Sequence, residues 1–409
     1  MPDRSVDHLL VGGGLAAASC ARRLREEGSE GSILVVGREP DPPYNRPPLS
    51  KGYLQGHEGR DDVLYRPPAW WDDQGIELLT RTSVMKLDAG GRVARLSTKE
   101  EVGFEKALLA TGANVNRLPV EGSDQDGIHY LRAFGNADAI RADAEAAERV
   151  VLVGGSYIGC EVAASITAAL GARCSILMQE GVTLERQFGP LVGGFFQRVL
   201  TDHGIEVHGG QTLARFEGDG ERVRRVVTES GLELDCDCVV IGAGVTPDVT
   251  LARGAGLTIG DTGGVECSAG LETSAAGIFA AGDICEWDSA LHGRRIRVEH
   301  WDVASSHGVT AALNMLRRGV EHEAVPYFFS DLADWVSMEY VGPGSGDTVV
   351  RGSMDDARFT VFWVDGGRVT AALAVGRSDD LEHARRFITD RAERELLALA
   401  DESTDLAAL

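Results

Sequence analysis

The stretch DHLLVGGGLAAASCARRLREEG, residues 7–28, decides the fold of the N-terminal part of the chain. Its apolar run ending at Val11 predicts a buried strand, glycines 12–14 predict a tight turn, and alanines 16–18 predict a helix that packs closely on the strand. Glycines let the backbone approach a pyrophosphate, and the helix N-terminus offers it free N–H groups and a positive dipole end. The stretch therefore indicates a dinucleotide-binding unit.

A second stretch, RVVLVGGSYIGCEVAASITAALG, residues 149–171, repeats this pattern of strand, glycine turn and helix. Here 150–153 is the expected strand, 154–156 the turn, and Gly159 the packing position on the helix. Each stretch is followed by another apolar strand, SILVVG or CSILMQ. One such pattern also occurs in sheets that bind nothing, but two copies about 140 residues apart indicate two dinucleotide-binding halves.

The composition is that of a large α/β protein. At roughly 150 residues per domain, a chain of 409 residues predicts two or three domains. Hydrophobic residues make up 43%, charged residues 25%, and 51 glycines favour many tight turns between strands and helices. The sequence has no apolar run of about 18 residues, and its N-terminus enters a strand without a charged and apolar leader. We therefore expect a cytoplasmic protein with no membrane partner.

The charge and the cysteines exclude two further classes of protein. A net charge of -23 argues against a nucleic-acid partner, because phosphates would be repelled at long range. The seven cysteines show no spacing typical of a disulfide framework or a zinc site, so we expect no metal. They are Cys20, Cys160, Cys174, Cys236, Cys238, Cys267 and Cys285.

The remaining segments complete an α/β plan. KALLATGA, CVVIGAGVTPD and AGIFAAGDICE predict three buried strands that each end in a glycine turn, the later ones marking the return of the chain from the second half to the first. After about Glu321 the pattern changes to the strands TVVRGSM, RFTVFWV and RVTAALAV and the helical DLEHARRFITDRAERELLALA. This pattern predicts a small α+β domain, with a frayed tail DESTDLAAL.

Eight motifs, in this order over essentially the whole chain, carry a family resemblance. They are VGGGLAAA, RPPLSK, ATGA, VGGSYIGCEVA, IGAGVTPD, FAAGD, VEHWDVA and PYFFSDL. The sequence resembles the FAD-dependent ferredoxin reductases that pass electrons from NADH to a two-iron ferredoxin serving Rieske dioxygenases or haem monooxygenases, a family related to apoptosis-inducing factor. The resemblance implies two Rossmann-like domains of the glutathione reductase type plus the small C-terminal domain. The expected domains are 1–113 with 246–322 for FAD, 114–245 for NAD, and 323–409.

The resemblance also implies the FAD-binding residues. Gly12, Gly14 and Ala16 would hold the pyrophosphate, Asp283 a ribitol hydroxyl, and Glu39 the adenosine ribose, with the preceding Arg38 as the alternative position for that contact. Val84 would lie near the adenine, Arg132 near the phosphates, and Trp301 at the pyrimidine edge of the flavin. The remaining expected contacts are Leu15, Arg46, Lys51, Ala110, Thr111, Gly112 and Gly282.

The loop PYNRPPLSKGYL, residues 43–54, presents one lysine to the flavin. Pro47 and Pro48 fix the backbone, so Lys51 has little entropy left to lose when the flavin binds. A cation beside the flavin stabilises its reduced form. In the family this lysine pairs with a glutamate, here Glu161, and such a pair in a desolvated cleft would keep the lysine charged. The alternative is a surface lysine in a proline-rich loop.

The second glycine turn is the expected NADH site. The expected residues are Gly154, Gly155, Ser156, Tyr157, Ile158, Gly159, Glu180 and Gly244. No arginine directly follows the second strand to hold a 2′-phosphate, and Glu180 lies where an acid binds a free 2′-hydroxyl, so NADH is expected over NADPH. Relatives carry that acid at the Met178 position. Ser156 replaces a glycine, which either weakens the pyrophosphate contact or adds a hydrogen bond.

The sequence identifies the electron acceptor less specifically than it identifies the fold and the cofactor. Phe329 stands where many relatives have Trp, and Phe328 and Phe329 are equally consistent with core positions. The chain lacks the cysteine pair of disulfide reductases of this fold. The expected ferredoxin is acidic, and cationic candidates for its docking are Arg294, Arg295, Arg297, Arg317 and Arg318. Two rival functions stay open: an NADH oxidase or small-acceptor reductase, and a slow NADH sensor of the apoptosis-inducing factor type.

Overall fold

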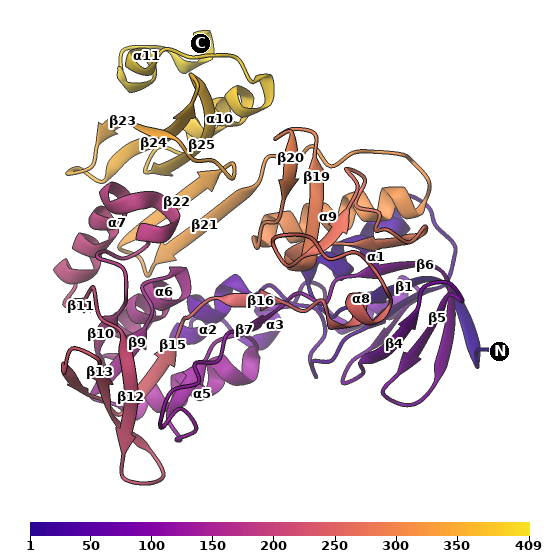
Figure 1. Cartoon of the computed structure of the whole chain (residues 1–409), viewed down its shortest axis with the longest axis horizontal. Helices are drawn as coiled ribbons and strands as arrows, with labels where there is room; N and C mark the ends of the chain where they lie inside the picture. The colour runs from indigo at the N-terminus through magenta and orange to yellow at the C-terminus, as the bar shows by residue number, and fades with distance from the viewer.

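The computed structural model describes residues 1–409 and is built around three large sheets (Figure 1). The first sheet has the order β3-β2-β1-β6-β5-β4, with β18 paired to β6. The strands β3, β2, β1, β6 and β18 are parallel, and β4 and β5 are antiparallel additions. The strands are β1 (Arg4–Val11), β2 (Ile33–Val36), β3 (Ile76–Leu79), β4 (Val84–Asp88), β5 (Val93–Leu96), β6 (Glu101–Leu109) and β18 (Ile278–Ala280).

Four helices, α1, α4, α8 and α9, pack on this sheet or on one another, whereas the short α2 lies against the second half, in whose core its Leu54 is buried (Figure 1). Gly308 of α9 lies so close to α1 that a Cβ there would come within 2.2 Å of the Ala16 carbonyl oxygen. The alanines of α1 are therefore close-packing positions, as their small size predicts. The helices are α1 (Leu15–Glu26), α2 (Gly52–Gln55), α3 (Arg60–Val63), α4 (Pro68–Asp73), α8 (Thr250–Gly254) and α9 (Trp301–Met315).

The second half repeats the parallel arrangement with the order β11-β10-β9-β15-β8. A three-stranded meander, β12-β13-β14, extends from it. Helix α6 continues as one π-helical turn over 166–170. The strands are β8 (Ile128–Tyr130), β9 (Arg149–Val153), β10 (Arg173–Leu177), β11 (Glu206–His208), β12 (Leu213–Gly218), β13 (Val223–Thr228), β14 (Glu233–Asp235) and β15 (Cys238–Ile241), and the helices are α5 (Phe134–Ala146), α6 (Tyr157–Ser165) and α7 (Glu185–Asp202).

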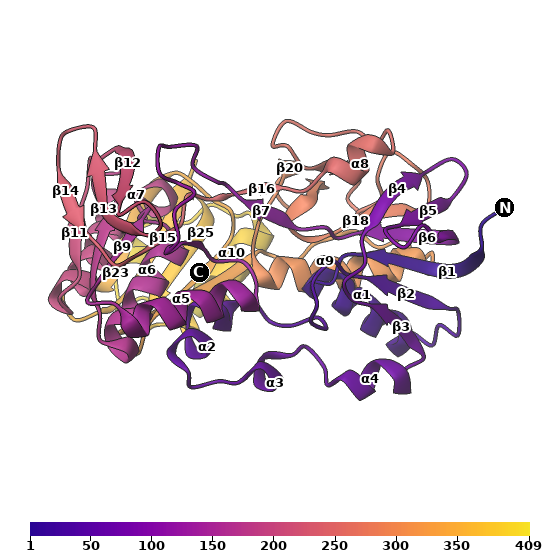
Figure 2. The ribbon, with the colours of Figure 1, turned by 90° about the horizontal axis from the view of Figure 1, so that it is seen from below.

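Two antiparallel strands carry the chain between the halves. It leaves the first half through β7 (Ala113–Val115) and returns through β16 (Val245–Pro247), and the pair lies between the two lobes in Figure 2. After the return, β18 pairs with β6 of the first sheet, as the sequence predicts for a discontinuous first half. A small sheet of β17 (Val265–Cys267), β19 (Cys285–Ser289) and β20 (Arg294–Ile296) completes this half.

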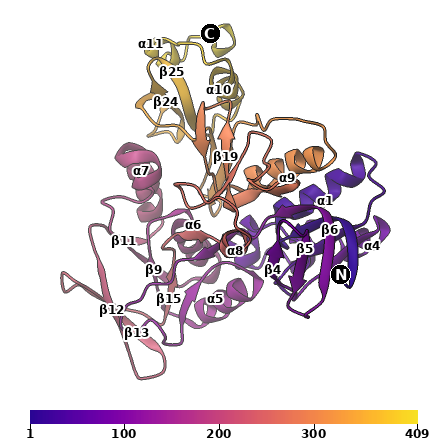
Figure 3. The same cartoon turned by 45° about the vertical axis from the view of Figure 1, so that its right-hand side comes forward.

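The C-terminal part is an antiparallel sheet of order β21-β22-β25-β24-β23 covered by α10. In Figures 1 and 3 it lies above α7, and aromatic side chains of α7 and of the sheet share one core: the rings of Phe195 and Phe359 are 4.8 Å apart. Its elements are β21 (Tyr327–Leu332), β22 (Val336–Val341), β23 (Asp347–Ser353), β24 (Arg358–Asp365), β25 (Arg368–Val375), α10 (Asp379–Asp390) and α11 (Leu396–Ala400).

Two expectations for the C-terminal end are wrong. The expected single helix breaks at Arg391, whose φ of 56° ends α10 in a left-handed conformation. The tail is not frayed, because the buried Arg351 donates hydrogen bonds to the carbonyl oxygens of Asp401 and Thr404, at 2.6 and 3.0 Å. Leu406 is also buried against the sheet and α10. No helix has both the length and the apolar character needed to cross a bilayer.

Two buried histidines are expected to make the fold acid-sensitive. His307 Nδ1 accepts a hydrogen bond from the Gly282 N–H at 3.3 Å, and His322 Nδ1 lies 3.0 Å from the Thr310 hydroxyl. Burial lowers the pKa of His322 to about 4 and that of His307 well below its usual value. The unfolded chain therefore takes up these protons first as the pH falls.

We expect the free energy of unfolding to fall between pH 6.5 and pH 4, by about 2 kcal/mol for each of these histidines at pH 5. Urea unfolding at pH 7.5, 6 and 5 measures the loss. The variant His322→Gln should lose less stability on acidification than the wild type, whereas the exposed His57→Gln should match it. Equal acid slopes in His322→Gln and wild type would contradict the prediction.

Candidate functional site

One cavity of about 1190 Å³ runs between the two halves and under the C-terminal sheet. All fifteen residues expected to bind FAD line it: Gly12, Gly14, Leu15, Ala16, Glu39, Arg46, Lys51, Val84, Ala110, Thr111, Gly112, Arg132, Gly282, Asp283 and Trp301. Of the residues expected at the NADH site, Ser156, Tyr157, Ile158 and Gly244 also line it, as does Glu161. The cavity thus extends from the first glycine turn to the second, while the individual contacts stay predictions.

The first glycine turn has no room for a side chain at Gly12. Gly12 has φ of +135°, and a Cβ there would lie 2.1 Å from the carbonyl oxygen of Ala110. Gly14 precedes α1, no side chain caps that helix, and a Cβ at Gly14 would meet nothing within 4 Å. The first-turn N–H groups of α1 are therefore available to an anion in the cavity. This donor set fits the pyrophosphate of a dinucleotide.

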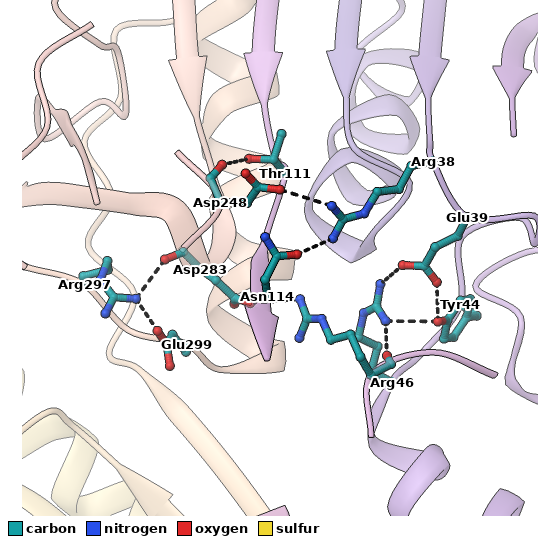
Figure 4. A network of polar contacts seen from close by, with 11 residues as sticks. Arg38, Glu39, Tyr44, Arg46, Thr111, Asn114, Asp248, Asp283, Arg297 and Glu299 are labelled. Atoms are coloured by element: carbon teal, nitrogen blue, oxygen red, sulfur yellow. Dashed lines mark hydrogen bonds and ion pairs between the residues drawn. The ribbon is translucent and has the colours of Figure 1, made fainter. Parts of the chain in front are cut away.

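Charged side chains of both signs line the cavity beside this turn (Figure 4). Arg46 pairs with Glu39 at 2.5 Å and with the Tyr44 hydroxyl at 3.0 Å, and Arg132 lies 3.5 Å from Asp283. Burial alone would raise the pKa of Glu39, but the Arg46 charge and the Tyr44 hydrogen bond hold it below its usual value. The carboxylates offset the charges of both arginines, and all four side chains are partly exposed to the cavity.

The two candidates for the adenosine ribose both have protein partners. The Glu39 oxygens bind Arg46 and the Tyr44 hydroxyl. Arg38 donates to Asn114 at 2.7 Å and to Asp248 at 3.2 Å, which ties the end of β2 to the strands between the halves (Figure 4). The ribose contact stays a prediction for both residues.

The loop that carries Lys51 is held in place by a short helical turn and by aromatic packing. Pro47–Ser50 form a 3₁₀ turn, and Tyr44 and Tyr53 of the flanking segments pack on Phe134 of α5, with ring centroids at 4.2 and 5.0 Å. The Lys51 ammonium lies 2.7 Å from a carboxylate oxygen of Glu161, whose side chain is 3% exposed. The buried pair therefore sits in the cavity wall, and Lys51 is not a free surface lysine.

The second glycine turn packs as closely as the first. Gly154 has φ of +111°, and a Cβ at Gly159 would lie 2.1 Å from the Gly154 carbonyl oxygen. The Ser156 hydroxyl donates to the Gly242 carbonyl at 3.0 Å and accepts a long hydrogen bond from the Gly159 N–H. Ser156 is therefore an N-cap for α6 that points into the protein, and its hydroxyl supports the turn.

The acid expected at the adenosine end of this site forms an ion pair. Glu180 lies 2.6 Å from Arg186 in a small separate hollow that Gln179, Gly181 and Glu185 also line. Met178, the alternative position, is buried, and a Cβ at Gly155 would lie 2.3 Å from its sulfur. Its side chain therefore abuts the second glycine turn, and the ribose contact stays a prediction for both positions.

An aromatic wall closes the side of the cavity next to the C-terminal sheet. Phe328 packs between Tyr157 at 4.4 Å and His300 at 4.9 Å, and the Phe329 ring lies 5.4 Å from the Lys51 ammonium. Both phenylalanines line the cavity and are only half-buried. Trp301 is 39% exposed, and its indole N–H donates to Asn45 at 3.1 Å. Trp301 is therefore the point at which this side of the cavity reaches the protein surface.

The cationic candidates for a docking surface are mostly occupied. Arg295 donates to the Cys267 carbonyl at 2.9 Å, Arg297 is paired with Glu299, and Arg318 lies 3.4 Å from Glu27. Arg294 and Arg317 have no ion-pair partner. Arg294, Arg295, Arg317 and Arg318 are nevertheless exposed, and their contact with a ferredoxin stays a prediction.

Several lining or supporting residues escaped sequence reasoning. They are Tyr44, Asn45, Ser50, Asn114, Asp248 and Ser330. Ser50 directly precedes Lys51 in the motif LSK, so its position beside the expected lysine could have been predicted from the sequence. The others come from distant segments and carry no motif that marks a contact.

Two family models cover most of the chain. The model for pyridine nucleotide-disulphide oxidoreductases matches residues 6–308, and the model for the reductase C-terminal domain matches 327–409. The chain is 33% identical to putidaredoxin reductase of Pseudomonas putida, over 97% of this chain and 95% of that one.

Two further relatives agree. The chain is 33% identical to the ferredoxin--NAD(+) reductase component of the anthranilate 1,2-dioxygenase system of Burkholderia cepacia, over 97% of this chain and 98% of that one. It superposes with a TM-score of 0.93 on the crystal structure of a covalent putidaredoxin reductase–putidaredoxin complex, at 32% identity over 98% and 97% of the two chains. The chain therefore belongs to the pyridine nucleotide-disulphide oxidoreductase family of FAD-binding, NAD(P)H-using enzymes.

Proposed function

We propose that this protein is an NADH-dependent flavoprotein reductase that uses FAD to pass electrons to a two-iron ferredoxin of an oxygenase system. The observation that carries the proposal is a single cavity with a glycine turn at each end and the Lys51–Glu161 pair in its wall. The names of the relatives, a putidaredoxin reductase and a reductase component of a dioxygenase system, supply the class of acceptor.

The proposed assignments give each half one nucleotide. Residues 1–113 and 246–322 would bind FAD, residues 114–245 NADH, and 323–409 would form the C-terminal domain, a division that the pairing of β18 with β6 supports. A cytoplasmic location belongs to the same proposal, because all seven cysteines are free thiols, as in a reducing compartment.

The residues of the chain have binding and positioning roles. FAD, when bound, supplies the chemistry of hydride acceptance and single-electron release. The turn at Gly12 and the N-terminus of α1 would hold its pyrophosphate, and Lys51 would place a cation at its ring. The aromatic wall formed by Phe328 and Phe329 would keep water from one side of the ring. No side chain has to move a proton.

The second turn would orient NADH. The N-terminus of α6, which begins at Tyr157, would face the NADH pyrophosphate, and Glu180 would accept hydrogen bonds from a ribose that lacks a 2′-phosphate. Arg186 beside Glu180 offsets part of this negative charge. We therefore expect the protein to prefer NADH over NADPH without excluding NADPH completely.

Anaerobic stopped-flow spectroscopy of the yellow holoprotein tests the proposal. NADH should bleach the flavin faster than NADPH does at equal concentration, and a two-iron ferredoxin should then reoxidise it promptly. Rapid turnover on oxygen or a quinone without ferredoxin would favour an oxidase or small-acceptor reductase instead. Slow bleaching and an NADH-dependent change of oligomeric state would favour a sensor.

A further inference from the structure

The carboxylate of Glu161 receives three donors, only one of which is Lys51. The Ser50 hydroxyl donates to one oxygen at 2.5 Å. The Ser330 hydroxyl donates to the other oxygen at 2.5 Å, and that second oxygen is also the one 2.7 Å from the Lys51 ammonium. Ser50, Ser330 and Glu161 are buried, while the Lys51 side chain is 15% exposed toward the cavity. Removing the hydroxyl of either buried serine therefore takes a hydrogen-bond donor from a buried carboxylate.

We infer that Ser330 is a positioning residue that reaches Lys51 through Glu161. The inference rests on the proposed function only in placing Lys51 beside bound FAD. Because Ser330 and Lys51 share one carboxylate oxygen, the serine fixes the orientation in which that oxygen faces the ammonium. Charge-assisted hydrogen bonds are the short and strong ones, which suits this orienting role.

The three donors come from three separate parts of the chain. Ser50 ends the 3₁₀ turn of the first half, Glu161 lies in α6, and Ser330 lies in β21 of the C-terminal sheet. The backbone of Ser330 is held by pairing with Met338 of β22, so its hydroxyl is presented from a rigid strand. The C-terminal sheet therefore has a direct part in placing the cation at the cavity wall.

The alternation of side chains along β21 separates this role from that of Phe329. Side chains alternate along a strand, so Phe329 and Ser330 project from opposite faces of β21. Phe329 lies 5.4 Å from the Lys51 ammonium, while Ser330 reaches it only through Glu161. Substitution of Ser330 thus changes the carboxylate without removing a ring from the cavity.

The test measures the midpoint potential of the bound flavin and its rate of reduction by NADH in Ser330→Ala. A less ordered cation stabilises the reduced flavin less, so we expect a lower midpoint potential and a roughly tenfold slower reduction. Ser330→Thr, which keeps the hydroxyl, should restore both values. Ser330→Cys, which keeps the volume but donates weakly, should behave as Ser330→Ala and serves if that variant folds poorly.

The matched control is Ser337→Ala on the neighbouring strand β22. Its hydroxyl donates to Asp331 at 2.6 Å at the surface and has no contact with Glu161. The potential and the rate in this variant should equal those of the wild type. A potential in Ser330→Ala and Ser330→Cys equal to that of Ser337→Ala would overturn the inference.

A double-mutant cycle with Lys51→Met separates the inference from the proposed function. If Ser330 acts through Lys51, Ser330→Ala should lower the potential in the wild type and leave it unchanged in Lys51→Met. An equal shift in both backgrounds would overturn the inference while the role of Lys51 stands. If Lys51→Met alone changes neither the potential nor the rate, the role of Lys51 in the proposed function fails, and the inference fails with it.

Discussion

The variant Gly12→Ala should purify as a colourless protein without bound FAD. A Cβ at this position would lie 2.1 Å from the Ala110 carbonyl oxygen and 2.7 Å from its carbon, and both are backbone atoms that cannot rotate away. The φ of +135° adds strain for any L-residue. We expect the backbone conformation to cost roughly 1–3 kcal/mol and the overpacking a similar amount. The clash would force β1 and β6 apart at the cavity.

The flavin absorbance per protein and the urea midpoint measure these two effects. The matched control is Gly194→Ala in α7, where a Cβ meets nothing within 4 Å and φ is not positive. This control should keep its flavin and be as stable as the wild type or up to about 1 kcal/mol more stable, because alanine favours helix. A yellow Gly12→Ala protein with wild-type stability would show that position 12 does not approach the Ala110 backbone as closely as the structure indicates.

The glycine turns could be predicted because their signal is local. At Gly12 and Gly154 the strand, the turn and the helix are contiguous in the sequence, and the positive φ values follow from a turn that only glycine adopts freely. The return of the chain to the first sheet could also be predicted from its apolar strands. Short local patterns were therefore enough to predict the strand, the glycine turn and the helix in both halves.

Contacts between distant segments could not be predicted in this way. Ser50 and Glu161 are 111 positions apart, and Glu161 and Ser330 are 169 apart, so no spacing connects them. The same holds for Arg38 and Asp248, 210 positions apart. Whether an arginine is engaged depends on such neighbours. Arg295 donates to the Cys267 carbonyl, 28 positions away, and Arg297 to the Asp283 carbonyl, 14 positions away, and no sequence motif marks either contact.

The second large effect is expected for Glu161→Gln. The substitution keeps the shape of the side chain and removes its charge, which leaves Lys51, whose side chain is 15% exposed, without a counter-charge. Breaking a buried pair by neutralising one partner costs about 3–5 kcal/mol, because the other charge stays desolvated. Reduction of the flavin by NADH should also slow roughly ten- to hundredfold if Lys51 moves from its position.

Denaturant unfolding and stopped-flow reduction test this expectation against the exposed pair Arg141–Glu145. That pair joins residues four apart on α5 at 2.8 Å, with both side chains more than 40% exposed. Glu145→Gln should therefore change the free energy of unfolding by less than about 0.5 kcal/mol and leave the reduction rate unchanged. The two variants remove the same charge by the same chemistry, so only burial separates them. Equal losses of stability would mean that the Lys51–Glu161 pair is hydrated and that the cavity wall is open to water at this point.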